Sequence, residues 1–187
     1  MEENRPEDIR SSRQKLIMLI MIAFVPIFIA YAAFFYFPDW APDGTTNQGE
    51  LISPPMPAEQ LTPALTEFGT WVLLQPTGTR CDEACTELLY LSRQVVTGLG
   101  KDTSRIQRVV LPEGVLAPEF AALLNEEHPD VAVRPGDHAP LAAIVTERPV
   151  LLLMDPNGNV MMYYLLDKAG KPMLKDLKHL LRVSNIG

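Results

Sequence analysis

The chain has 187 residues, of which 47% are hydrophobic and 21% charged, and its formal net charge at pH 7 is −7. This length accommodates one ordinary domain with an accessory segment, and the hydrophobic content is sufficient for a buried core. The acidic balance excludes a basic nucleic-acid-binding surface, because the basic residues beyond the N-terminal segment are scattered among acidic ones. No nucleic acid partner is therefore expected.

Residues 16–37 form an apolar run without a charged residue, LIMLIMIAFVPIFIAYAAFFYF. A helix needs about 20 apolar residues to cross a bilayer, whereas the apolar part of a cleaved secretory signal has only about 7–15. We therefore expect an uncleaved transmembrane helix. Basic residues precede the run and Asp39 and Asp43 follow it. The positive-inside rule then predicts residues 1–15 in the cytoplasm and the rest of the chain on the periplasmic side of a bacterial inner membrane.

Residues 38–63 are rich in Pro, Gly, Thr, Asn and Ser and show no sustained apolar period. Such a composition is typical of an extended tether. The remaining residues, 64–187, are predicted to fold as one periplasmic domain on a single anchor.

Within this domain, short apolar runs of strand length alternate with segments whose apolar residues recur every three or four residues, as in helices. The predicted elements are a strand at 71–75, a helix at 81–99, a strand at 106–111, a helix at 116–129, strands at 149–154 and 159–166, and a helix from Pro172 onwards. This order predicts an α/β protein of the thioredoxin-like fold, in which a central mixed sheet is flanked by helices.

The two cysteines, Cys81 and Cys85, lie one helical turn apart where a predicted helix begins. A helix N-terminus stabilises a thiolate, and residues four apart share one face with their Cβ atoms about 5–6 Å apart. The pair can therefore form a disulfide or share a soft metal ion. A purely structural disulfide is the alternative, although it would close a very short loop and so stabilise the fold little.

Pro149 stands directly before the predicted buried strand PVLLLM. In thioredoxin-like proteins a cis-proline at this position lies beside the dithiol, and the resemblance to those proteins makes Pro149 a candidate site residue. The alternative is a trans proline at the start of a strand, where its missing N–H is tolerated.

The stretch GTWVLLQPTGTRCDEACTELLYL, residues 69–91, resembles the Sco/SenC family of copper-handling cytochrome oxidase assembly proteins. The stretch LLLMDPNGNV resembles the Asp-Pro-x-Gly hairpin of the same family. The resemblance implies a thioredoxin-like fold and one copper ion held by both cysteines and a histidine shortly before the hairpin aspartate. The corresponding position here holds Glu147, whose hard carboxylate oxygen suits Cu(I) poorly.

The chain has three histidines, and only His138 lies in a predicted loop from which it could approach the thiols. The candidate Cu(I) ligands are therefore Cys81, Cys85 and His138. The alternative for His138 is an ordinary solvated loop residue.

Two functions follow from these features. The first is a membrane-anchored assembly factor for a copper-containing respiratory oxidase, which transfers Cu(I) or reduces the copper-ligand cysteines of its client. The second is a general periplasmic thiol-disulfide oxidoreductase resembling the TlpA/ResA group, in which Cys81 attacks and Cys85 resolves the mixed disulfide. A non-catalytic scaffold with a structural disulfide is a third alternative.

Overall fold

The computed structural model describes residues 6–36, 47–144 and 149–184. The chain divides into two compact units, residues 1–46 and residues 47–187. The first unit contains helix α1 (Pro6–Tyr36), whose segment Ser12–Tyr36 is long and apolar enough to cross a membrane. The chain thus carries an N-terminal apolar helix where the sequence predicts the anchor.

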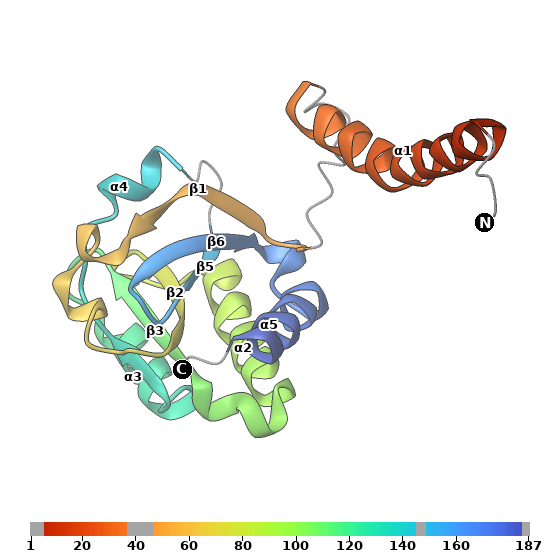
Figure 1. Ribbon diagram of the computed structural model, residues 1–187. Helices are drawn as coiled ribbons and strands as arrows, with labels where there is room; N and C mark the ends of the chain where they lie inside the picture. Colours follow the sequence, from red (N-terminus) through yellow and green to blue (C-terminus); the bar gives the residue numbers. More distant parts are fainter. Residues whose placement is uncertain (1–5, 37–46, 145–148, 185–187) are drawn as a thin grey trace. The chain divides into compact units, whose positions relative to one another are not determined.

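The second unit is built on a six-stranded mixed sheet with the strand order β1-β6-β5-β2-β3-β4. Strands β2, β3 and β4 are parallel to one another, whereas β5 is antiparallel to β2 and β6, and β6 is antiparallel to β1. In chain order the elements are β1 (Glu50–Pro57), β2 (Trp71–Thr77), α2 (Glu83–Gly98), β3 (Ile106–Pro112), α3 (Pro118–Glu127), β4 (Val131–Val133), α4 (Ala139–Ala142), β5 (Val150–Met154), β6 (Asn159–Leu165) and α5 (Lys171–Val183) (Figure 1).

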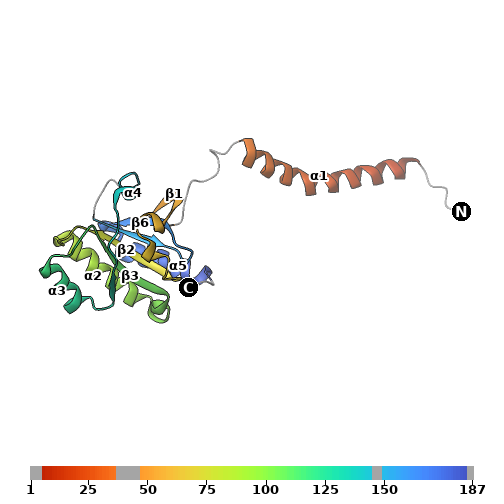
Figure 2. The ribbon, with the colours of Figure 1, turned by 90° about the vertical axis from the view of Figure 1, so that its left-hand side faces the viewer.

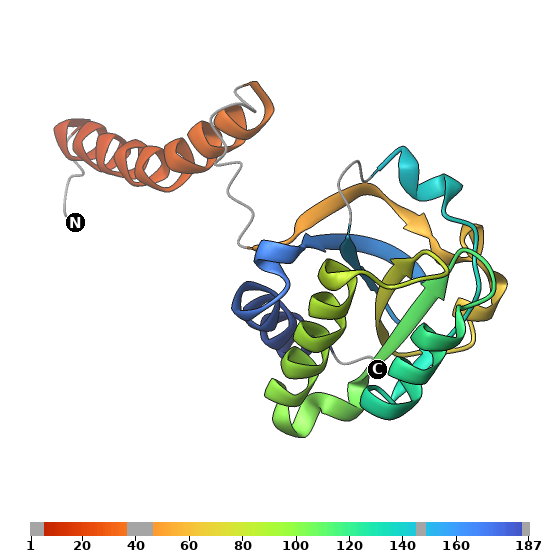
Figure 3. The same cartoon turned by 180° about the vertical axis from the view of Figure 1, so that it is seen from behind.

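Helices α2 and α3 cover the same face of the sheet. The connections β2-α2-β3 and β3-α3-β4 advance in one direction across the sheet, and both are parallel crossovers. Because such crossovers are almost always right-handed, both helices are placed on one face. Figure 2 shows α2 and α3 on one side of the strands and α4 on the other, and Figure 3 shows the helical face from the front. Helix α5 packs beside α2 in a shared apolar cluster that includes Leu73, Leu88 and Leu177.

The opposite face is covered by residues that the sequence analysis assigned to the tether. Strand β1 pairs with β6, and two short 3-10 helices, Ala58–Gln60 and Pro63–Leu65, follow it. Their apolar side chains are buried against sheet residues that include Val72, Leu74, Val109 and Leu152; the buried residues of this segment are Ile52, Met56, Ala58, Leu61 and Leu65. The predicted tether is therefore wrong from β1 onwards, and the compact unit begins at Asn47.

A buried carboxylate on α5 fixes the start of this unit. Asp176 accepts hydrogen bonds from the backbone N–H groups of Gln48 and Gly49, at 2.7 and 2.9 Å, and from the Tyr164 hydroxyl at 3.2 Å. Gly49 fits because a Cβ atom there would lie 2.5 Å from the Tyr164 ring. Burial raises the pKa of Tyr164, so its hydroxyl keeps the proton that it donates to Asp176.

Strand β1 forms one edge of the sheet and is interrupted between Leu51 and Met56, where its register with β6 shifts. The interruption contains Pro54 and Pro55, both exposed and without a backbone N–H. The other edge is β4, which has only three residues.

Candidate functional site

Cys81 and Cys85 are joined in a disulfide at the start of α2, with their Cα atoms 5.3 Å apart. Asp82 caps the helix, since its side chain accepts a hydrogen bond of 2.9 Å from the backbone N–H of Cys85. Cys81 therefore lies just before the helix and Cys85 in its first turn. The helix thus begins at Glu83, two residues after the predicted start at Cys81, and only Cys85 lies within it.

The two sulfurs differ in their surroundings. Cys85 is buried, with 7% of its surface exposed, and packs against residues that include Leu89, Val110 and Phe120. Cys81 is partly exposed. A thiolate from solution or from another protein therefore reaches Cys81 first.

Each sulfur also has a polar neighbour of its own. The Thr86 hydroxyl lies 3.7 Å from Cys81 Sγ and 2.9 Å from the backbone oxygen of Asp82. The side-chain amide of Gln75, on β2, donates to the backbone oxygen of Cys85 at 2.9 Å and lies 3.6 Å from Cys85 Sγ. Neither residue was predicted from the sequence as part of the site. The signal for Gln75 was a polar residue inside an otherwise apolar strand.

A groove of about 500 Å³ opens beside the exposed sulfur. Cys81 lines it together with Phe120 and Leu123 of α3, which are apolar, and with Arg80 and Glu119, which are exposed and carry opposite charges. Cys85 is not among the residues that line this groove. The space therefore allows a segment of another protein to lie against Cys81.

His138 is buried rather than solvated, with 4% of its surface exposed. Its Nε2 atom lies 2.7 Å from the backbone oxygen of Leu111, at the end of β3, and its Nδ1 atom lies 3.9 Å from the Glu113 carboxylate. The interpretation of His138 as a solvated loop residue is therefore wrong. The burial of Leu141 in α4, which directly follows His138, brings this segment onto the sheet.

Pro149 lies at the entry to β5, as the sequence predicts. The cis-proline hypothesis depends on the peptide bond between Arg148 and Pro149, and Arg148 lies outside the described residues. Glu147, at the position of the family histidine, also lies outside them.

The donor atoms of the described residues do not form the predicted copper site of Cys81, Cys85 and His138. The two sulfurs are bonded to each other, so neither is a thiolate, and His138 directs Nε2 to Leu111. Across residues 6–36, 47–144 and 149–184, no three His, Cys, Asp or Glu side chains are grouped so that they could hold a metal ion. The structure does not bring His138 together with the two cysteines as ligands of one ion.

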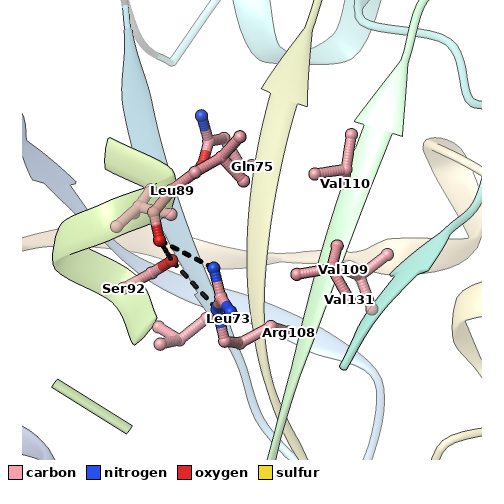
Figure 4. A pocket seen from close by; sticks show the side chains of 9 residues that line it. Leu73, Gln75, Leu89, Ser92, Arg108, Val109, Val110 and Val131 are labelled. Atoms are coloured by element: carbon pink, nitrogen blue, oxygen red, sulfur yellow. Dashed lines mark hydrogen bonds between the residues drawn. The ribbon is translucent and has the colours of Figure 1, made fainter. Parts of the chain in front are cut away.

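A buried arginine holds α2 on the sheet one turn beyond Cys85. Arg108, on β3, has 3% of its surface exposed and donates to Ser92 Oγ at 3.0 Å and to the Leu89 backbone oxygen at 2.7 Å (Figure 4). It also forms an ion pair of 3.0 Å with Asp130. Burial lowers the pKa of Arg108, and Asp130 opposes this shift. These contacts fix the register of α2, and with it the height of Cys85 above the strands.

His128 completes this cluster. Its Nδ1 atom lies 3.4 Å from a guanidinium nitrogen of Arg108, and since arginine only donates, this ring nitrogen is the acceptor. Burial is the main cause that lowers the pKa of His128, and the positive charge of Arg108 lowers it further. The imidazole is therefore neutral at pH 7.

Comparison with known proteins places these features in a family. Residues 71–184 match the family model described as transmembrane-like, thioredoxin-like, C-terminal domain. No curated protein sequence matches the chain.

Solved structures similar to this chain come from several bacteria. Apo Sco1 from Thermus thermophilus superimposes with a TM-score of 0.50 at 20% identity, over 75% of this chain and 99% of that one. ScoI from Bradyrhizobium japonicum, solved with copper bound, gives 0.43 at 20% identity, over 59% and 85%. A thiol:disulfide interchange protein from Bacteroides sp. gives 0.48 at 12% identity, over 73% and 91%.

At this level of identity the likeness to Sco1 concerns the fold, and it confirms the thioredoxin-like architecture expected from the order of the elements. The family model covers more than half of the chain and includes strand β2, the disulfide and α5. The chain therefore belongs to the family of transmembrane-like, thioredoxin-like proteins that this C-terminal domain defines.

Proposed function

We propose that this protein is a membrane-anchored thiol-disulfide exchange protein that acts on the cysteines of another protein. The observation that carries the proposal is the asymmetry of the Cys81–Cys85 pair, in which one sulfur is partly exposed beside a groove and the other is buried. A purely structural cross-link gains little from an exposed sulfur or from the short loop that it closes here.

In the proposed reaction a partner thiolate attacks Cys81 Sγ. A disulfide forms between the partner and Cys81, the Cys81–Cys85 bond breaks, and the electron pair of that bond leaves on Cys85 as a thiolate. A second thiolate of the partner then releases Cys81, so two partner thiols become a disulfide and the protein becomes a dithiol. In the opposite direction the reduced pair returns two electrons to a partner disulfide.

The proposed location and partner come from the sequence. The basic residues before the apolar run 16–37 and the acidic residues after it favour an N-terminus in the cytoplasm, an anchor in the bacterial inner membrane and a domain in the periplasm. The two sequence blocks that resemble the Sco/SenC family favour a respiratory oxidase subunit as the client, whose copper-ligand cysteines the dithiol would keep reduced.

Cu(I) transfer to the same client is a second candidate, with the ion as cargo. The observation that favours it is the separation of 5.3 Å between the two Cα atoms, because reduction would leave two soft thiolate ligands side by side. His138 is not required for such a two-sulfur site.

The first experiment tests exchange itself. The full chain in detergent micelles is equilibrated with glutathione buffers of graded potential, quenched with acid and alkylated, so that the two redox states separate by mass. We expect one reversible two-electron transition above about −300 mV, because structural disulfides typically lie below that value. A transition below this value, or a disulfide that glutathione leaves intact, would support the scaffold with a structural disulfide instead.

The second experiment tests the cargo. If Cu(I) is carried, the reduced chain is expected to bind about one ion through its thiolates, and Cys85→Ser should abolish this binding. His138→Ala should leave the affinity unchanged, because Nε2 of His138 contacts the Leu111 backbone oxygen. Competition with a chromophoric Cu(I) chelator measures the Cu(I) affinity of the parent chain and of the two variants. A large loss of Cu(I) affinity in His138→Ala would instead support a three-ligand site of Cys81, Cys85 and His138.

A further inference from the structure

Gln75 is a buried polar residue whose amide is only half satisfied. It has 2% of its surface exposed, and its nitrogen donates to the backbone oxygen of Cys85 and approaches Cys85 Sγ. Its side-chain oxygen is buried without a hydrogen-bond partner within the described part of the chain. An unpaired buried oxygen destabilises the folded state, and an apolar residue of similar size would avoid this cost. Packing alone therefore does not account for a glutamine at this position.

The proposed exchange reaction gives the Gln75 amide a role. In the disulfide, Cys85 Sγ is a neutral and weak acceptor, in keeping with the long approach of 3.6 Å from the Gln75 nitrogen. When the disulfide opens at Cys81, Cys85 receives the electron pair and becomes an anion at a site of 7% exposure. A buried anion is costly unless a donor lies beside it, and the Gln75 N–H group is already in place.

The surroundings orient the amide for this role. Gln75, Ser92 and Arg108 line one small cavity between the sheet and α2. Figure 4 shows the amide nitrogen of Gln75 pointing away from Arg108. Since a guanidinium repels an N–H donor and attracts a carbonyl oxygen, the buried cation favours the orientation that presents the nitrogen to Cys85.

We propose that Gln75 takes part directly in the exchange reaction, because its amide stabilises Cys85 as the departing thiolate when a partner thiolate opens the disulfide. The inference rests on the proposed exchange function and adds to it the group that receives the developing charge. Thr86 provides the matched comparison, since its hydroxyl faces the other sulfur.

The experiment uses the full chain in detergent micelles with Cys81→Ser, so that Cys85 is the only thiol, and follows its ionisation by ultraviolet absorbance as the pH is raised. Adding Gln75→Leu is expected to move the midpoint to higher pH and to reduce the thiolate at neutral pH about tenfold. In the chain with both cysteines, Gln75→Leu should slow opening of the disulfide by glutathione about tenfold. Thr86→Val should leave the midpoint of the Cys85 titration unchanged.

Gln75→Glu tests the charge in nearly the same shape. Its carboxylate should slow opening more than Gln75→Leu does when it is ionised, and the difference should disappear as the pH falls and the carboxyl group is protonated. Equal Cys85 titrations with and without Gln75→Leu, or a pH profile of Gln75→Glu parallel to that of the parent chain, would overturn the proposal. Because the titration needs no partner, it distinguishes a failure of this inference from a failure of the exchange function.

Discussion

A chain with Cys85→Ser is expected to accumulate a mixed disulfide between Cys81 and a client cysteine in its native membrane. Cys81 is the partly exposed sulfur beside the groove, and the thiol that would release it is absent from this variant. Cys81→Ser should trap about tenfold less or none, because Cys85 is buried beneath α3 side chains such as Phe120. Acid quenching, alkylation and non-reducing electrophoresis reveal the adducts, and mass spectrometry identifies the cysteine that each contains.

The double variant, in which both cysteines are serine, sets the background for this trapping. Alkylation of the reduced wild-type chain at neutral pH gives an independent test, in which Cys81 should be labelled before Cys85. Equal labelling, combined with adducts no stronger than in the double variant, would mean that the pair does not exchange. The disulfide would then be structural or the thiols would serve copper alone.

Replacing Arg108 with methionine is expected to lower the free energy of unfolding by about 3 kcal/mol, since buried hydrogen bonds from a charged donor contribute about 1.5–3 kcal/mol each. Methionine keeps much of the apolar stem but leaves the Leu89 carbonyl and the Ser92 hydroxyl without the guanidinium that now joins them to β3. Urea unfolding of the full chain in detergent, followed by tryptophan fluorescence, measures the loss.

Asp130→Asn is the control for this prediction. The Asp130 side chain is 56% exposed, so its ion pair with Arg108 is screened by water and should contribute about 1 kcal/mol or less. If the free energy of unfolding of Arg108→Met lay within about 1 kcal/mol of the wild-type value, apolar packing alone would hold α2 on the sheet. The buried arginine would then have another role.

The sequence predicted the elements whose apolar residues follow a regular period. Helices α2, α3 and α5 show apolar residues at spacings of three and four, and β2, β3 and β5 are short, mainly apolar runs. The segment from Asn47 to Leu65 was missed because its apolar residues are separated by prolines, a bulge and 3-10 turns, which leave no period to detect. Strand β4 was missed because three residues are too few to show one.

Within the site, the spacing of Cys81 and Cys85 was sufficient to predict a pair at a helix start. Their polar neighbours were not predictable, because Gln75 and Arg108 occur in strands that read as apolar, and only the sheet register brings them beneath α2. His138 was assigned to solvent because local sequence does not reveal that Leu141 draws its segment onto the sheet.

The prolines of β1 protect this edge of the sheet from pairing with strands of other molecules. A membrane anchor confines copies to two dimensions, where an open sheet edge would pair with the edge of a neighbouring copy and lead to aggregation. Pro54 and Pro55 offer no N–H to such a strand, and the opposite edge spans only the three residues of β4. Neither edge is a good template for strand addition. Under the proposed exchange function, a partner would meet the domain at its sulfurs and not at either edge of its sheet.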